Sequence, residues 1–293
     1  MAASCQRLDR ISVKELSPAA PSQSSRRNRS QRCERVLKRN IRNLLIKLGI
    51  FGPIFRAREI VTAVRSPIRE THGPDGLPLP GAYLRMLVAG TPDPKWFLDS
   101  GLRDLTRLVE LVNRSGGDFR SFHAVLDFGC GCGRVARHLA KITNAQICGS
   151  DYNPRLVRWC QENLPGHFSQ NRLRPPLPFE DKSFDCIYAL SVFTHLREDT
   201  QFEWLTELRR VLRLGGYLIV SFQDEGYINE PRVKKLLSNH GFLIQNNLLE
   251  GSNLMATYHT HEYVKKRFAE YFRVLETVQG DGPRLALALL RKE

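Results

Sequence analysis

The chain has 293 residues, of which 42% are hydrophobic and 25% charged, a composition typical of a globular protein with one large domain plus extensions or at most two domains. Its formal net charge is +14, yet residues 1–70 hold 16 Lys and Arg against 5 Asp and Glu, so the basic character belongs to the N-terminal part. Seven cysteines, an odd number, do not suggest a disulfide framework, and the most apolar early segment, 44–55, is too short to span a bilayer. Because the N-terminus also lacks an apolar leader, we expect a reduced, cytoplasmic protein.

The first 65 residues divide into two parts by composition. Residues 1–33 are rich in Ser, Arg, Gln and Pro and are predicted to be a disordered basic arm. Residues 34–65 are predicted to be a basic amphipathic helical extension, because its first part has apolar residues at helical spacing with Arg and Lys between them (Val36, Leu37, Ile41, Leu44, Leu45 and Leu48). Residues 34–51 suit peripheral contact with an anionic membrane or packing against the folded body. Nucleic acid is a less favoured partner, because no aromatic residues for stacking precede Phe51.

Residues 66–119 are predicted to be a linker followed by helices. Proline and glycine are dense between residues 66 and 81, which is typical of a linker or of a loop that wraps a domain. Apolar residues then recur at helical spacing within 82–113, where Pro92 and Pro94 interrupt the pattern.

Residues 123–142 contain the clearest signal for a ligand site. An apolar run ends in Asp127, a glycine-rich turn follows, and residues 134–142 have helical spacing (the glycines are Gly129, Gly131 and Gly133). A strand, a tight turn and a helix in this order open a nucleotide-type α/β domain, whose ligand lies beyond the carboxyl ends of the strands. A dinucleotide fingerprint would need a further glycine at the position of Arg134. The carboxylate of Asp127 would repel a pyrophosphate and suits a cationic or amino-bearing ligand.

A second expected strand, 146–151, also ends in an acidic residue, Asp151. Two carboxylate oxygens at that place can accept both hydroxyl groups of a ribose, and Tyr152 beside them can pack on an adenine face. The alternative role for Asp151 is to cap the next helix, which Asn153 and Pro154 begin. We favour ribose binding because both carboxylates stand at the ends of strands.

Beyond a further strand at 186–190, the segment 191–196 contains His195, whose ordinary pKa suits proton transfer near neutral pH. A structural hydrogen-bonding role is the alternative for this histidine. A helix over 202–212, ended by a pair of glycines at 215 and 216, and a strand over 217–222 are expected next.

Residues 223–270 are less regular, with a helix expected over 234–240 and a strand over 242–249. The stretch 251–264 is predicted to be an acceptor-recognition loop acting through Tyr258 and His259, and a purely structural loop is the alternative. The chain is predicted to end in a β-hairpin made of 272–278 and 285–290.

Residues 120–222 resemble the class I S-adenosylmethionine-dependent methyltransferases. The resemblance rests on four features in the family's order: the glycine motif after Asp127, the acidic strand end at Asp151, the strand that follows Phe184-Asp185, and Leu214-Gly215-Gly216 before an apolar strand. It implies an α/β, Rossmann-like, doubly wound sheet of seven strands in the order 3-2-1-4-5-7-6 with helices on both faces. It also implies a methyltransferase domain over 120–293 with an acceptor-recognition insertion at about 223–270. The preceding helices would form a lid, with Tyr83, Arg85, Trp96 and Phe97 as its candidate residues.

The cofactor that this resemblance implies is S-adenosylmethionine, and we expect no metal site, because the sequence shows no clustered His, Asp and Glu at ligand spacing. Many members of the family contact the adenine amino group through an acidic residue, whereas this chain has Asn171 in that loop. The residues expected at the cofactor are Asp127, Phe128, Gly129, Cys130, Gly131, Gly133, Asp151, Tyr152, Asn153, Asn171 and Ser191.

The implied reaction is methyl transfer by in-line displacement, and three hypotheses remain for its use. The first is transfer to a small-molecule, glycan or lipid acceptor with His195 as the base. The second is methylation of RNA or protein, with the basic arm as the docking surface. The third is a non-catalytic S-adenosylmethionine-binding module, which the intact Asp127 and Asp151 disfavour. Deleting residues 1–65 should separate the first two, because only the second predicts a loss of acceptor binding.

Overall fold

The computed structural model describes residues 51–65, 71–245, 249–281 and 284–293. The predicted disordered arm and residues 34–50 of the predicted helical extension lie outside these ranges, so the proposed membrane contact stays a prediction. Residues 52–293 form one compact unit. Within the described ranges, no helix is both long enough and apolar enough to cross a membrane.

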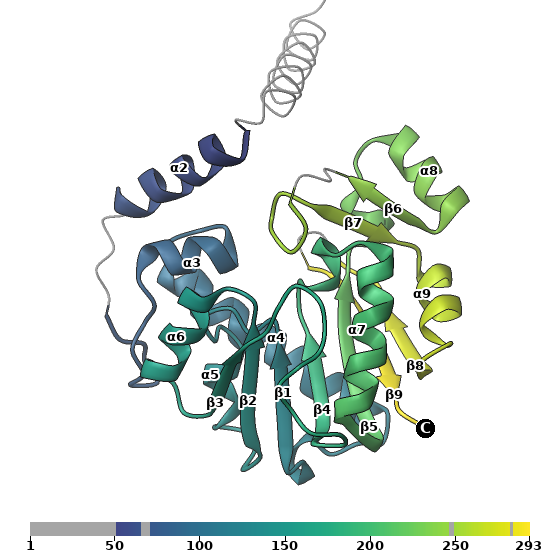
Figure 1. The fold of residues 1–293 in the computed structure, drawn as a ribbon, viewed down its shortest axis with the longest axis horizontal. Coiled ribbons are helices and arrows are strands. Elements are labelled where there is room, and N and C mark those ends of the chain that lie inside the picture. The colour runs from purple at the N-terminus through teal and green to yellow at the C-terminus, as the bar shows by residue number, and fades with distance from the viewer. Residues whose placement is uncertain (1–50, 66–70, 246–248, 282–283) are drawn as a thin grey trace, which may run out of the picture. The chain divides into compact units, whose positions relative to one another are not determined.

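A seven-stranded sheet organises this unit (Figure 1). Its strands are β1 (Ala124–Phe128), β2 (Gln146–Asp151), β3 (His167–Gln170), β4 (Phe184–Ala189), β5 (Leu212–Phe222), β8 (Arg273–Val278) and β9 (Ala286–Arg291). They lie in the order β3-β2-β1-β4-β5-β9-β8; β9 pairs antiparallel with both β5 and β8, and the other pairs are parallel. The predicted order 3-2-1-4-5-7-6 is confirmed, because β8 and β9 are the sixth and seventh strands of this sheet.

Helices cover both faces of the sheet, as predicted (Figure 1). One face packs against α4 (Pro94–Arg114), α5 (Ala136–Leu139) and α6 (Pro154–Asn163), and the other packs against α7 (Glu198–Val211) and α9 (His261–Phe268). Among the described residues, two helices precede α4, namely α2 (Phe51–Val64) and α3 (Ala82–Ala89). Short 3-10 turns are η1 (Phe119–Ser121), η2 (Phe193–His195) and η3 (Glu225–Tyr227).

The central strand β1 shows how the core is built. All five of its residues are buried, with Leu126 and Phe128 in the cluster beneath α7 and Val125 in the cluster beneath α4. A parallel strand covered on both faces is expected to be a continuous apolar run, which explains the sequence pattern there. The rings of Phe128 and Trp204 lie 4.5 Å apart, so α7 is anchored directly beneath the carboxyl end of β1.

Several element boundaries differ from those predicted, among them the strand expected over 242–249, which ends at Gln245. The glycine pair at 215 and 216 does not end a helix, because β5 begins at Leu212 and passes through it. Gly215 has a φ of +74°, and the pairing of β4 with β5 shifts register between Phe184 and Cys186, as a β-bulge requires. The helix expected over 134–142 is shortened to α5, and α7 begins at Glu198, four residues earlier than predicted.

Residues 223–270 are more regular than their sequence indicated. They contain α8 (Pro231–His240), a small two-stranded sheet of β6 (Phe242–Gln245) and β7 (Ala256–His259), and α9. The helix predicted over 234–240 and the terminal hairpin are confirmed as α8 and as β8 with β9. The stretch predicted to be a loop, 251–264, includes β7 and the first turn of α9, so only its beginning is loop.

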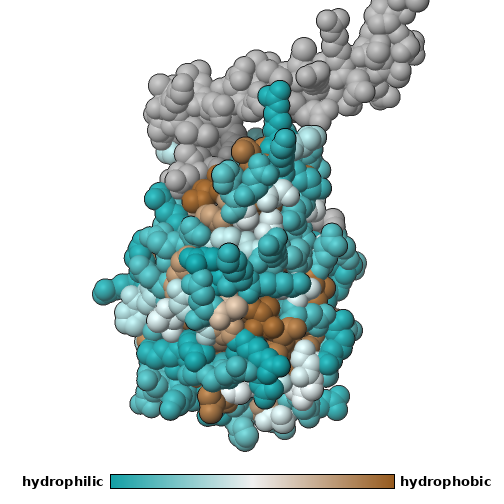
Figure 2. Space-filling view, turned by 90° about the vertical axis from the view of Figure 1, so that its right-hand side faces the viewer, coloured by the Kyte–Doolittle hydropathy of each residue, from teal (hydrophilic) through white to brown (hydrophobic). Residues whose placement is uncertain are grey.

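Strand β8 forms one edge of the large sheet. Its polar side chains, among them the exposed Arg273, discourage pairing with a strand of another chain. Figure 2 shows the molecule from the side of this edge, where a mostly hydrophilic surface surrounds a small apolar patch.

Candidate functional site

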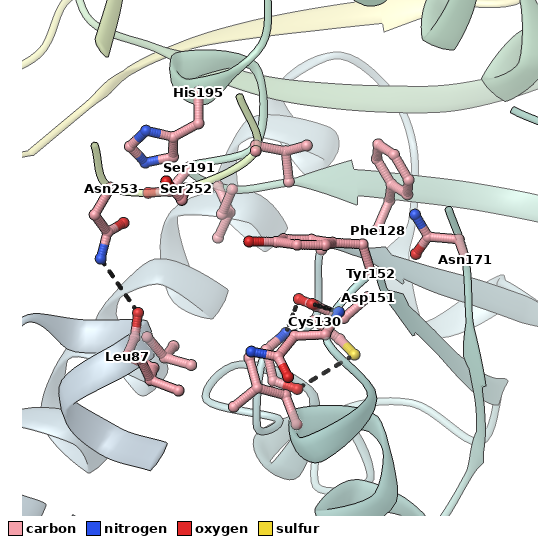
Figure 3. A pocket seen from close by; sticks show the side chains of 18 of the residues that line it. Leu87, Phe128, Cys130, Asp151, Tyr152, Asn171, Ser191, His195, Ser252 and Asn253 are labelled. Carbon is pink, nitrogen blue, oxygen red and sulfur yellow. Dashed lines mark hydrogen bonds between the residues drawn. The ribbon is translucent and has the colours of Figure 1, made fainter. Parts of the chain in front are cut away.

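A cavity lies beyond the carboxyl ends of β1, β2 and β4, where the order of the sheet reverses (Figure 3). Of the residues predicted from the sequence, the cavity is lined by Asp127, Phe128, Gly129, Cys130, Gly131, Asp151, Tyr152, Asn153, Asn171, Ser191 and His195. The lining does not include Gly133, Tyr258 or His259. Further lining residues were not among those predicted for the site, although their segments were predicted as a helical extension, a lid and an acceptor loop (Arg56 and Glu59 of α2, Leu87 and Val88 of α3, and residues 251–254).

The glycine turn after β1 has the left-handed backbone that its sequence predicted. Gly129 and Gly131 have φ values of +80° and +55°. A Cβ atom on Gly129 would lie 2.2 Å from Cγ2 of Val192, so a side chain there is excluded by space as well as by conformation. Gly133 supports the turn from behind, where a Cβ would meet Cδ1 of Leu164 at 2.1 Å.

Asp151 holds this turn in place. One carboxylate oxygen accepts the N–H of Gly131 at 2.9 Å, and the other accepts the N–H of Asn153 at 2.8 Å. Burial raises the pKa of Asp151, and these two backbone donors lower it in part. Each oxygen keeps a second lone pair, so the carboxylate can fix the turn and still accept a hydroxyl group of a ligand.

Asp127 is buried behind the turn, in surroundings that favour its neutral form. Burial raises the pKa of this carboxyl group to about 7, although the neighbouring Tyr188 hydroxyl and the Arg134 guanidinium act to lower it. Arg134 itself is held by an ion pair with Asp104 at 2.7 Å. A cation placed near Asp127 would therefore shift the carboxyl group toward its ionised form.

Asn171 is fixed by three hydrogen bonds. Its Oδ1 accepts from the hydroxyl of Ser150 at 3.0 Å, its Nδ2 donates to the carbonyl of Arg172 at 2.6 Å, and its backbone N–H donates to the carbonyl of Asp151 at 3.1 Å. One lone pair of Oδ1 remains for a ligand donor. The side chain is thus oriented in advance at the end of β3.

On the other side of the cavity, His195 lies with Ser252 and Asn253, across from Cys130 and Asp151 (Figure 3). His195 Nδ1 lies 2.6 Å from the carbonyl oxygen of Met255. Because a carbonyl oxygen only accepts, Nδ1 carries the proton and Nε2 keeps a free lone pair. Burial lowers the pKa of this histidine, which keeps its ring neutral and able to accept a proton.

Tyr258 and His259, the predicted acceptor residues, belong to β7 and do not line the cavity. His259 is fully buried, and its Nε2 lies 2.8 Å from Oε1 of Gln201. Burial lowers its pKa to about 3, so it is a neutral core residue. The segment that reaches the cavity is 251–254, a few residues earlier in the same stretch, where Asn253 donates to the carbonyl of Leu87 in α3 at 3.3 Å.

The four candidate lid residues also lie outside the lining. Phe97 is fully buried, and Arg85 is buried with its Nε donating to the carbonyl of Pro92 at 2.7 Å. The residues of α3 that line the cavity are Leu87 and Val88, one turn later in the same helix.

Within the described ranges, Asp224, Glu225 and His261 bring metal-ligand atoms within 4.8 Å of one another. The carboxylate of Asp224 already accepts from the N–H groups of Gly226 at 3.0 Å and Gly280 at 2.9 Å, and it lies 3.3 Å from Nε2 of His261. These contacts satisfy Asp224 within the protein, and we assign the cluster a structural role at the end of β5.

Residues 126–220, which span the glycine turn, Asp151 and His195, match the model of the methyltransferase domain family. They form a methyltransferase domain of the class I S-adenosylmethionine-dependent superfamily. Its cofactor is S-adenosylmethionine, as the sequence predicted.

Two relatives show how far this similarity extends. The methyltransferase GfsG of Streptomyces halstedii is 30% identical over 139 residues, which cover 44% of this chain and 48% of that protein. The fatty-acid O-methyltransferase of Mycolicibacterium smegmatis is 38% identical over 100 residues, which cover 32% of this chain and 35% of that protein. The chain thus spans half or less of the length of either relative.

A solved structure gives a similar match. The magnesium protoporphyrin IX methyltransferase of Synechocystis PCC 6803, solved with bound S-adenosylhomocysteine, superposes with a TM-score of 0.47 at 19% identity, over 67% of this chain and 86% of that one.

A pH dependence of cofactor binding follows from the buried Asp127. The pKa of Asp127, about 7, lies far above the ordinary value for an aspartate, so below pH 7 this carboxyl group is mostly protonated. Binding of a cationic ligand should displace that proton. Affinity for S-adenosylmethionine should therefore rise as pH increases through 7, by at most about tenfold per pH unit below that pKa. Calorimetric titrations between pH 6 and 8 check this. The Asp127→Asn variant should bind S-adenosylmethionine more weakly, with an affinity that does not change with pH. If its affinity depends on pH as steeply as that of the wild-type protein, the displaced proton belongs to another group.

Proposed function

We propose that the chain transfers the methyl group of S-adenosylmethionine to a hydroxyl group of a small-molecule, glycan or lipid acceptor. The observation that carries this proposal is His195, a neutral imidazole with a free Nε2 on the cavity wall opposite the glycine turn and Asp151. A hydroxyl group loses its proton on methylation, and a neutral imidazole in that position suits its removal. Apolar side chains of Leu87, Val88 and Leu254 line the same cavity and suit an acceptor with an apolar part.

In the proposed reaction, the cofactor and the residues that line the cavity have separate roles. When bound, the cofactor supplies a methyl group that the sulfonium charge has already activated. Asp151 holds the ribose, the glycine turn and Asp127 border the methionine part, and His195 with residues 251–254 holds the acceptor. His195 orients the attacking hydroxyl group and accepts its proton, because its Nδ1–H is fixed on Met255. Alignment of this kind contributes up to about 7–11 kcal/mol in favourable models.

The rival functions stay open to a direct test. A docking role for the basic arm in binding RNA or protein concerns residues outside the described ranges, and so does membrane contact through residues 34–51. Deleting residues 1–65 would also remove Arg56 and Glu59 of α2, which line the cavity. A loss of acceptor binding would then not distinguish a lost docking surface from a damaged cavity. A deletion that ends at residue 50 keeps this helix, and loss of acceptor binding alone would then favour the docking hypothesis.

Replacing His195 by glutamine should lower kcat about 100- to 10,000-fold while the affinity for S-adenosylmethionine changes less than twofold. The assay follows labelled methyl groups from S-adenosylmethionine into an alkyl glycoside, a hydroxy fatty acid, bulk RNA and a protein mixture. We expect label in one of the first two. Label only in RNA or protein would contradict the acceptor class, and full activity of the variant would remove His195 as the base.

A further inference from the structure

Helix α2 contributes two oppositely charged side chains to the cavity. Arg56 and Glu59 lie three positions apart, close to one helical turn, and both line the cavity. On the same side of the helix, Ala63 is buried, and a Cβ atom on Gly52 would lie 3.8 Å from Cδ1 of Leu254. This side of α2 therefore faces the site, although it lies about 70 residues before the glycine turn in the chain.

Glu59 has the features of a ligand-binding group. The residue is only 7% exposed, and its Oε2 is buried without a hydrogen-bond partner among the described residues. Burial raises the pKa of this carboxyl group, and the charge of Arg56 lowers it in part. A buried carboxylate oxygen without a donor costs free energy in the ligand-free protein, which a ligand that brings a donor would recover.

The charges of the cavity match those of the amino-acid end of the cofactor. That end carries a positive sulfonium, a positive ammonium and a negative carboxylate. Apart from Asp151 at the ribose side, the lining offers the two buried acids Asp127 and Glu59. Among its arginines, Arg134 is paired with Asp104 and Arg172 is exposed, which leaves Arg56 as the half-buried cation beside Glu59.

We infer that α2 binds the amino-acid end of S-adenosylmethionine, with Glu59 accepting from the ammonium group and Arg56 facing the carboxylate. The inference rests on the cofactor of the proposed function and adds a second part of the chain to its binding site. Asp151 holds the ribose and the glycine turn borders the methionine part, to whose charged groups α2 adds Glu59 and Arg56 as partners. Cofactor affinity then depends on a helix that lies before the matched methyltransferase domain.

Two thioethers without the sulfonium charge isolate this contact: S-adenosylhomocysteine, which keeps the amino-acid end, and 5′-methylthioadenosine, which lacks it. In the full chain, Glu59→Gln should weaken binding of S-adenosylhomocysteine about ten- to a hundredfold, the loss expected for one charge-assisted hydrogen bond. Arg56→Gln should weaken it similarly. Affinity for 5′-methylthioadenosine should change less than twofold in both variants. Arg58→Gln, at an exposed position of the same helix, is the matched control and should change neither affinity.

Calorimetric titration gives the affinities, and thermal unfolding without ligand verifies that each variant is folded. Equal weakening of both thioethers would overturn the inference, because α2 would then act only as a general cover. Unchanged binding of both in Glu59→Gln would overturn it as well and would assign Glu59 to the acceptor. If the wild-type protein binds neither compound, the cofactor assignment itself fails, and the inference fails with it.

Discussion

Replacing Asp151 by alanine should weaken S-adenosylmethionine binding at least a hundredfold. The carboxylate has two functions that alanine removes together: it accepts the N–H groups of Gly131 and Asn153, and it has lone pairs left for the ribose hydroxyl groups. Hydrogen bonds to a charged group contribute about 1.5–3 kcal/mol each, so the loss of two corresponds to about 3 kcal/mol or more. Calorimetric titration of the folded variant measures the change in affinity.

Asp185 provides a matched control for Asp151, because it also accepts two backbone N–H groups but stands at the opposite end of the sheet. Its Oδ2 accepts from His123 at 2.7 Å and from Ala124 at 2.9 Å. Asp185→Ala should lower the stability of the fold and leave the cofactor affinity of the folded protein unchanged. Near-wild-type affinity in Asp151→Ala would contradict the ribose assignment and leave Asp151 as a cap.

Replacing Asp75 by alanine should reduce the free energy of unfolding by about 3–5 kcal/mol, since it leaves a buried arginine without its partner. Arg137 Nε and Nη2 donate to the two carboxylate oxygens of Asp75 at 2.8 and 2.9 Å, and the side chains are 0% and 2% exposed. Burial raises the pKa of Asp75, but the hydrogen bonds and charge of Arg137 outweigh it and bring the pKa below its ordinary value. The pair fastens the segment before α3 to α5.

Urea unfolding at neutral pH measures this loss, and Asp99→Ala is its control. Asp99 forms an ion pair with Lys95 at 2.6 Å on the exposed surface of α4, where its removal should leave stability unchanged within error. A loss below about 1 kcal/mol in Asp75→Ala would show that the buried pair contributes little beyond what it costs to desolvate.

Those parts of the fold that local sequence specifies were predicted well. The strand that ends in Asp127, the glycine turn and the acidic end of β2 each carry their signal within a few residues. The strand order followed from the family resemblance. The glycine pair at 215 and 216 was misinterpreted because left-handed glycine occurs both at helix ends and in bulges, and only pairing with β4 distinguishes them.

The rest of the site depends on contacts between distant segments. Arg56 and Glu59 have the sequence pattern of a solvent-exposed helix face, and their burial depends on where α2 packs. Tyr258 and His259 were predicted as acceptor residues because several histidines and tyrosines lie close together in 251–264. Strand β7 pairs with β6, however, and the side chain of His259 lies in the core. Residues 251–254 do line the cavity, but their side-chain types do not mark them as a binding site in the sequence.

Thermal unfolding of the full chain with and without S-adenosylmethionine tests the central claim most directly. A ligand that binds only the folded state adds about 2.7 kcal/mol to stability at one hundred times its dissociation constant. We predict a rise in the unfolding temperature of the wild-type protein that is lost in Asp151→Ala and retained in Asp185→Ala. No rise at saturating cofactor, or an equal rise in Asp151→Ala, would contradict the assignment of this cavity to S-adenosylmethionine.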